Sequence, residues 1–118
     1  ETANESIRKA IGYIKEHYRE DISLCDVANH VGLSHFYFTK IFKNEIGMTF
    51  VRYLTALRIE NAKKLMEKDP SIPIKELCYQ VGYNDPKYFC RAFQSIEKQS
   101  PTGYKRLLKE KEQQREDS

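Results

Sequence analysis

The sequence predicts an all-α protein of seven helices, arranged as two helix-turn-helix subdomains joined by a long linker helix. Three observations support this prediction. Apolar residues recur at helical spacing between short breaks, no stretch of useful length alternates as a strand does, and the pattern of residues 24–53 returns at residues 74–104. Two copies are too few for a solenoid, so the repetition indicates one small motif used twice.

The first three helices are predicted from an apolar stripe, a break and a cap. An i, i+3, i+4, i+7 pattern predicts an amphipathic helix over about residues 5–18. A short second helix begins near Leu24 and stops at Gly32. Ser34 can then cap a third helix that runs to about Ile46.

The fourth helix is the longest of the predicted elements. It follows Gly47, begins after a capping residue at Thr49, and stays amphipathic to about Glu67. The segment Lys-Asp-Pro-Ser-Ile-Pro then makes the clearest break in the chain.

The last three helices repeat this order. A fifth covers about residues 74–81, a sixth begins at Pro86 after the cap Asp85, and a seventh begins at Pro101 after Ser100. Proline suits a first helical position because its missing N–H has no partner there in any case.

These elements divide the chain into four segments. We expect a first helix-turn-helix subdomain at 1–48, a connecting helix at 49–68, a second subdomain at 69–108 and a charged, frayed tail at 109–118. Because the sequence opens without an initiator Met, we expect it to be part of a longer protein.

Composition narrows the function classes. The formal net charge is +3, but residues 34–106 hold 13 Lys or Arg against 7 Asp or Glu, so positive charge gathers where the repeats lie. No apolar run approaches the roughly 20 residues of a membrane-spanning helix. Three cysteines without a CxxC pair argue against a disulfide framework and favour a reducing, cytoplasmic setting.

Each copy of the repeat has an inner and an outer face on its second helix. The copies align at an offset of 50 up to the turn and of 51 after one inserted residue. A wheel of about 100° per residue predicts that each second helix buries one stripe: Phe38, Ile41 and Phe42 in the first copy, and Phe89, Ala92 and Phe93 in the second.

The opposite faces carry side chains suited to DNA. In a helix-turn-helix protein the N-terminal part of the second helix enters the major groove. The outward residues are Phe36, Thr39, Lys40 and Lys43 in the first copy, and Lys87, Cys90, Arg91 and Gln94 in the second.

Their chemistry matches known pairings with base edges and phosphates. Arg91 can bind guanine O6 and N7, Phe36 can press on a thymine methyl, and Gln94 can pair with adenine. Lys40 and Lys87 can contact bases or phosphates. The helix starts at Ser34, Thr49 and Ser100 suit phosphate oxygens.

At this point the sequence resembles a known family. The stretches ISLCDVANHVGLSHFYFTKIFKNEIGMTFVRYL, LRIENAKKLM and IKELCYQVGYNDPKYFCRAFQSIEKQSPTGYKRL look like the DNA-binding domain of AraC/XylS-type transcription regulators. The resemblance covers about residues 7–107, and the opening segment looks most like versions joined to response-regulator receiver domains.

The resemblance implies sequence-specific binding of double-stranded DNA by two recognition helices in successive major-groove segments. The base-reading positions that it implies are His35, Phe36, Thr39, Lys40, Pro86, Lys87, Tyr88, Cys90 and Arg91. By the helical wheel Tyr88 lies off the outward face.

The resemblance also implies partners and a setting. It implies contact with RNA polymerase, a bacterial cytoplasmic location, and an effector or receiver domain elsewhere in the full-length chain that supplies dimerisation. It implies no cofactor and no metal.

The chain departs from the family pattern at three positions. Lys98 stands where glycine is usual, and since a left-handed cap there is strained, we expect a different turn. Cys78 replaces a usual alanine. Cys90 replaces a usual serine or threonine, which puts hydrogen bonding on that flank in question.

Two other classes of function compete with this interpretation. A helical protein-interaction module without DNA binding has the same inner stripes. An enzyme needs a base beside one of the cysteines, and the three histidines fit no metal spacing such as HExxH. Matching outward faces on two matching corners favour DNA, because core packing does not require them.

Overall fold

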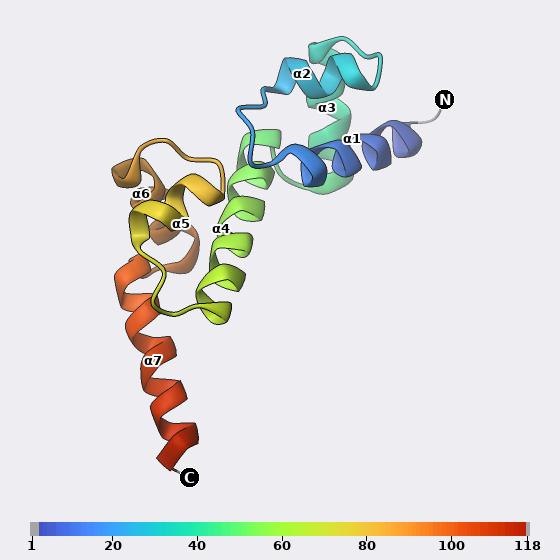
Figure 1. Ribbon diagram of the computed structural model, residues 1–118. Coiled ribbons are helices and arrows are strands. Elements are labelled where there is room, and N and C mark those ends of the chain that lie inside the picture. Colours follow the sequence, from blue (N-terminus) through green and yellow to red (C-terminus); the bar gives the residue numbers. More distant parts are fainter. Residues whose placement is uncertain (1–2, 118) are drawn as a thin grey trace. The chain divides into compact units, whose positions relative to one another are not determined.

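The computed structural model describes residues 3–117 and, within that range, contains seven α-helices and no strand (Figure 1). The helices are α1 (Ala3–His17), α2 (Leu24–His30), α3 (His35–Ile46), α4 (Phe50–Lys68), α5 (Ile74–Gln80), α6 (Pro86–Glu97) and α7 (Pro101–Asp117). The all-α prediction is confirmed.

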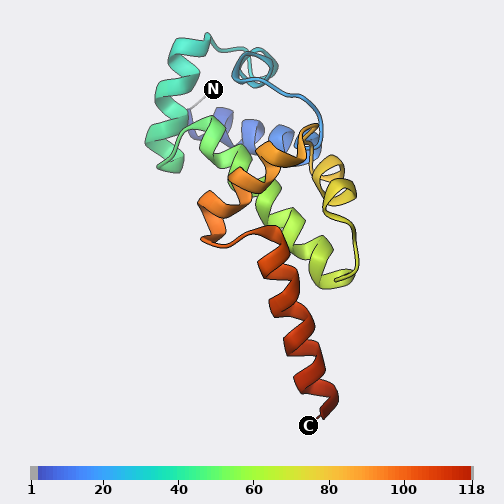
Figure 2. The same ribbon diagram turned by 90° about the vertical axis from the view of Figure 1, so that its left-hand side faces the viewer.

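The chain forms two compact units, Glu1–Leu57 and Arg58–Ser118. The boundary falls inside α4, so its first turns pack in the first unit and the rest in the second. Residues 1, 2 and 118 of the expected end segments lie outside the described residues. The tail expected to fray is helical as far as Asp117, and in both views the last turns of α7 extend past α5 and α6 (Figures 1 and 2).

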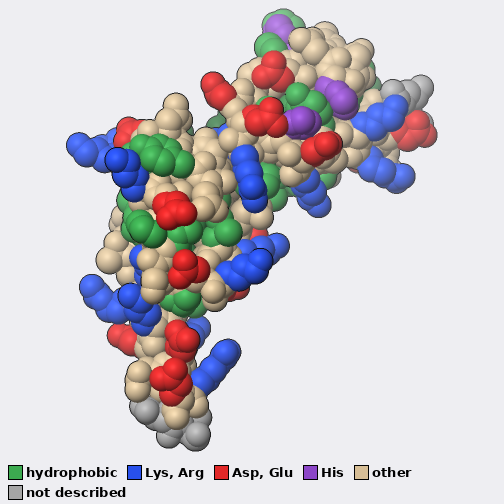
Figure 3. Space-filling model, viewed as in Figure 1, with side chains coloured by type: hydrophobic (Ala, Val, Ile, Leu, Met, Phe, Trp, Pro, Cys, Tyr) green, Lys and Arg blue, Asp and Glu red, His purple; other side chains and the backbone are tan. Residues whose placement is uncertain are grey.

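The first unit buries the apolar faces of α1, α2 and α3 around two phenylalanines. Phe38 and Phe42 are fully buried, and Phe42 meets Phe50 and Tyr53 of α4 with ring centroids 6.3 and 5.7 Å apart. At its surface the Tyr13 ring lies 4.4 Å from that of His17 and 4.3 Å from that of His30. Figure 3 shows histidine side chains gathered over α1 and α2.

The second unit repeats this core. Phe89 and Phe93 are fully buried, as are Leu77 and Cys78 of α5. The predicted inner stripes are therefore buried, except that Ala92 is only half-buried. Burial of a phenylalanine side chain stabilises a fold by about 1.5–3 kcal/mol, so the four helix phenylalanines are major core contacts.

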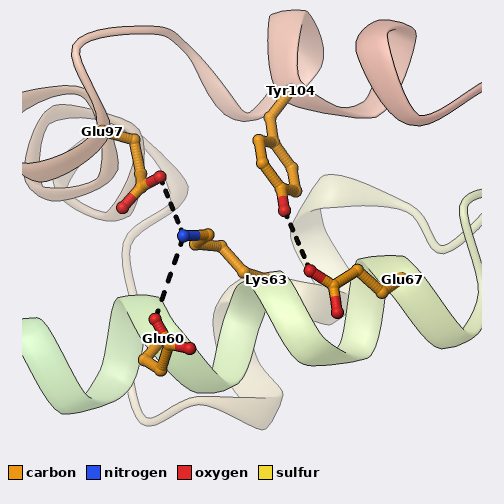
Figure 4. A network of polar contacts seen from close by, with 5 residues as sticks. All are labelled: Glu60, Lys63, Glu67, Glu97 and Tyr104. Atoms are coloured by element: carbon orange, nitrogen blue, oxygen red, sulfur yellow. Dashed lines mark hydrogen bonds and ion pairs between the residues drawn. The ribbon is translucent and has the colours of Figure 1, made fainter. Parts of the chain in front are cut away.

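A polar network ties α6 and α7 to the second half of α4 (Figure 4). Lys63 Nζ lies 3.1 Å from Glu97 Oε1 and 3.9 Å from Glu60 Oε2. The Tyr104 hydroxyl donates to Glu67 Oε1 at 3.1 Å. The hydrogen bond to Glu97 raises the pKa of Lys63, so its ammonium stays charged at neutral pH. This network holds the C-terminal end of the recognition helix α6 in place.

The two helix-turn-helix corners have the same backbone hydrogen bonds. Leu33 N–H donates to Ala28 O and Tyr83 N–H to Cys78 O, both at 3.0 Å. The preceding glycines have φ of 73° and 101°, which lets the chain reverse tightly. The repeat predicted from the sequence is thus a structural repeat.

One expected difference between the copies is absent. Gly47 ends α3 in the left-handed conformation with φ 85°, and Lys98 ends α6 in the same conformation with φ 63°. Both N–H groups donate to the carbonyl four residues earlier at 2.8 Å. The prediction of a different turn at Lys98 is wrong, because the turn keeps its cap hydrogen bond and left-handed backbone despite the missing glycine.

Candidate nucleic-acid interface

The two recognition helices, α3 and α6, begin at side-chain caps. Tyr37 N–H donates to Ser34 Oγ at 3.2 Å, and Lys87 N–H donates to Asp85 Oδ1 at 3.1 Å. Neither helix carries an acidic residue in its first turn. The first turn of α3, capped by a neutral serine, therefore keeps the positive end of the helix dipole, which favours an approaching polyanion, whereas the Asp85 carboxylate offsets it at α6.

The outward side chains of α3 are exposed. Phe36 is 83% exposed, an unusual fraction for such a large apolar side chain, and its ring stacks on His35 at 5.1 Å with an angle of 27°. Thr39, Lys40 and Lys43 are exposed along the same helix. The structure brings all five predicted positions of the first copy to its surface.

The Thr39 side chain forms a hydrogen bond within its own helix. Its hydroxyl donates to the His35 carbonyl at 2.7 Å. The oxygen keeps acceptor capacity, so it suits a base amino group, on adenine or cytosine, better than a carbonyl edge.

The outward side chains of α6 include two basic residues, as do those of α3. Lys87, Arg91 and Gln94 are exposed, and Tyr88 is 59% exposed although the helical wheel sets it off the outward face. Pro86 is half-buried at the first helical position. Figure 3 shows Lys and Arg side chains beside α6 and along α7.

Cys90, like Pro86, is less accessible than the other predicted α6 reading positions. It is half-buried, and burial raises the pKa of its thiol. Burial also raises the pKa of the Cys78 thiol, which donates to the Tyr83 carbonyl at 3.4 Å. Neutral thiols are poor nucleophiles and weak hydrogen-bond donors, so hydrogen bonding is a weak part of what the Cys90 side chain offers.

The predicted phosphate positions all cap helices. Arg52 N–H donates to Thr49 Oγ1 at 3.2 Å, and Gly103 N–H donates to Ser100 Oγ at 3.0 Å. In each hydroxyl the oxygen accepts the capping hydrogen bond, while the hydrogen can still be donated to a phosphate. Arg52, exposed in the first turn of α4, is a further candidate for a phosphate contact, and a basic residue three places after a capping threonine is the sequence signal that points to it.

Among the described residues no group of three or more His, Cys, Asp or Glu could hold a metal ion. No described helix is long and apolar enough to cross a membrane. Each unit, taken by itself, exposes one helix start with basic and aromatic side chains, which suits the edges of base pairs.

A family model described as a helix-turn-helix domain matches residues 27–107. The chain belongs to the AraC-type helix-turn-helix family. This is a family of DNA-binding transcription regulators rather than of enzymes, which confirms the family predicted from the sequence.

Individual relatives agree with this assignment. The chain is 32% identical over 108 residues to the regulatory protein PocR of Salmonella typhimurium, covering 91% of this chain and 35% of PocR. It is 34% identical to the C-terminal domain of AraT, a response regulator from Geobacillus stearothermophilus, with a TM-score of 0.83 and coverage of 86% and 84%. The chain thus spans about a third of the length of PocR.

The fold is shared more widely than the sequence. The DNA-binding domain of AdpA, solved with a target DNA, is 19% identical and superposes with a TM-score of 0.84 over 89% of this chain and 94% of that domain. At this identity the likeness shows the fold alone. The roles of individual residues in this AraC-type chain rest on its own geometry.

Proposed function

We propose that this AraC-type chain binds double-stranded DNA sequence-specifically, with α3 and α6 in successive major-groove segments, and so regulates transcription. The observation that carries the proposal is the pair of matching outward faces. At an offset of 51 residues, each recognition helix exposes Lys or Arg side chains in its first two turns, over a fully buried pair of phenylalanines.

The residue roles follow from exposure and chemistry. Arg91 and Lys87 read guanine or hold phosphate on α6, and Gln94 reaches adenine deeper in the groove. Phe36 contacts a thymine methyl, with Lys40 and Thr39 beside it on α3. The remaining proposed contacts come from His35, Lys43, Pro86, Tyr88 and Cys90, with phosphates at Ser34, Thr49 and Ser100.

The domain division is part of the proposal. Residues 1–48 and 69–108 are the two reading subdomains, residues 49–68 connect them, and residues 109–118 form a charged extension. In a cytoplasmic full-length protein, a receiver or effector domain supplies the signal and the dimer contact, and RNA polymerase is the further partner. The similarity to a response-regulator C-terminal domain supports this arrangement.

Salt dependence tests DNA binding directly. The chain is titrated onto a duplex selected from a random pool at several salt concentrations, and we expect the logarithm of the binding constant to fall linearly with the logarithm of salt. A helical protein-interaction module gives no duplex binding at low salt, or binding without that fall. Either result refutes the proposal for this chain.

Arg91→Ala tests base reading within the same assay. We expect a loss of about 1–3 kcal/mol on the selected duplex and relaxed preference at one base pair, because a bidentate contact to guanine is removed. Lys15→Ala, which removes an exposed basic side chain from α1, is the matched charge control and is expected to keep the preference. An equal loss on every duplex assigns Arg91 to a phosphate instead.

A further inference from the structure

Tyr88 is exposed at the start of α6 but does not stand alone. Its side chain is 59% exposed, and its ring centroid lies 5.7 Å from that of Tyr83 at an angle of 47°. Tilted aromatic pairs at this separation are attractive beyond the area that they bury. Tyr83, in the turn between α5 and α6, therefore restricts where the Tyr88 ring can lie.

Tyr83 is itself held from two further directions. It is 7% exposed, and its ring centroid lies 5.6 Å from that of the fully buried Phe89. The Arg58 guanidinium of α4 lies 5.1 Å from the centre of the same ring, a cation–π distance. An exposed reading position is thus connected through Tyr83 to the core and to α4.

The first copy has no such support. Leu33 occupies the position of Tyr83, and Tyr37 occupies that of Tyr88. A leucine offers no aromatic face, so Tyr37, which is 50% exposed, lacks a ring at this position to lean on. The two corners differ in one further way, since the turn of the second copy contains one inserted residue.

We propose that Tyr83, held by Arg58, is a positioning residue that fixes Tyr88 toward DNA and thereby sets base discrimination in the second half-site. The proposal rests on the proposed function, since it presumes that α6 reads DNA. The physical reason is preorganisation, because a side chain already held in its bound rotamer loses less conformational freedom on binding. Such a side chain also adapts less readily to a base other than the one it is positioned to contact.

The test uses the whole chain and a duplex selected from a random pool. Binding is measured on that duplex and on a panel in which each base pair of the second half-site is replaced in turn. Tyr88→Ala first identifies the base pair whose discrimination depends on Tyr88. We expect Tyr83→Leu, which installs the residue of the first copy, to lower discrimination at that same base pair by about 3- to 10-fold.

Three further variants distinguish a positioning role of Tyr83 from an effect on folding stability alone. Tyr83→Phe keeps the ring and is expected to keep discrimination within about twofold. Tyr83→Leu combined with Tyr88→Ala is expected to match Tyr88→Ala alone at that base pair, because the two residues act together. Tyr37→Ala in the first copy is expected to leave the second half-site unchanged.

The outcomes that overturn the inference are distinct from those that refute DNA binding. An equal loss on all duplexes, or unchanged discrimination in Tyr83→Leu, overturns it, as does a Tyr88→Ala variant that alters no base pair. If thermal melting shows that the Tyr83→Leu variant does not fold, the same binding assay is run on Arg58→Met. Lower discrimination in Arg58→Met then supports the inference, and unchanged discrimination overturns it. Absence of salt-dependent binding by the unmodified chain refutes the proposed function instead.

Discussion

At the scale of single residues, exposure separates reading positions from core positions on the same helix. Phe36 and Phe38 are two residues apart in α3, yet one is 83% exposed and the other fully buried. A buried phenylalanine is explained by packing. An exposed one, stacked on His35 at the start of α3, is the basis of the proposed contact with a thymine methyl.

Phe36→Ala is expected to abolish the preference for thymine at one position of the first half-site without altering the free energy of unfolding by more than about 0.5 kcal/mol. In the unmodified chain, replacing that thymine by uracil, which lacks the methyl group, is expected to weaken binding by about fourfold, since burying one such carbon is worth about 0.8 kcal/mol. Duplex titrations with both bases measure this.

The matched control for Phe36 is the neighbouring exposed ring. Tyr37→Ala is expected to keep the thymine-over-uracil preference. If Phe36→Ala retains that preference, Phe36 does not read the methyl group.

At the scale of elements, the ends of the two recognition helices show how one backbone shape is kept by different residues. Gly47 and Lys98 both adopt the left-handed conformation, which is costly for any residue with a Cβ. A Cβ built at Gly47 meets no heavy atom within 4 Å, so only backbone strain distinguishes the two caps. The conformational free-energy cost at Lys98 therefore arises from its own left-handed backbone.

Lys98→Gly is expected to stabilise the second unit by about 0.5–1 kcal/mol. Left-handed strain of about 1–2 kcal/mol is relieved, and the greater freedom of glycine in the unfolded chain offsets part of it. The exchange also removes the exposed hydrogen bond from Lys98 Nζ to Ser95 O, which contributes little. Chemical denaturation measures the change.

The reciprocal variant in the first copy provides the comparison. Gly47→Lys is expected to destabilise the first unit by about 1–2 kcal/mol, since it introduces the same strain. A Lys98→Gly variant that unfolds at lower denaturant than the original chain contradicts the strain argument.

At the scale of the whole molecule, α4 contributes residues to both compact units, and each unit contains one of the two proposed recognition helices. The 19 residues of α4 span roughly 28 Å at 1.5 Å per residue. Neighbouring major-groove segments on one face of DNA are about 34 Å apart. The proposed function therefore predicts two half-sites about one helical turn apart.

Changing the distance between half-sites tests this spacing. Inserting about five base pairs turns the second half-site to the opposite face of the duplex, and inserting about ten places it a further helical turn away. We expect both insertions to weaken binding at least about tenfold, because one recognition helix loses its base contacts in each case. Binding restored by the ten-base-pair insertion contradicts this spacing.

Much of the fold was predictable because local signals agree with one another. Helical spacing, the capping residues at 34, 49, 85 and 100, and the glycine at 32 all indicate the same seven helices, and the repeat supports every element except the first. The outward positions Phe36, Lys40, Lys87 and Arg91 followed from helical geometry alone, and all four are exposed.

The sequence by itself determined the all-α class, the doubled corner and the chemistry of the outward faces, because these depend on spacing within one helix or one turn. Only the tertiary structure decided that Lys98 keeps a left-handed cap, that Cys90 is half-buried, and that the Tyr83 ring contacts both Tyr88 and the Arg58 guanidinium. The contact between Arg58 and Tyr83 joins residues of different elements, 25 positions apart, and it is set by packing and not by local pattern.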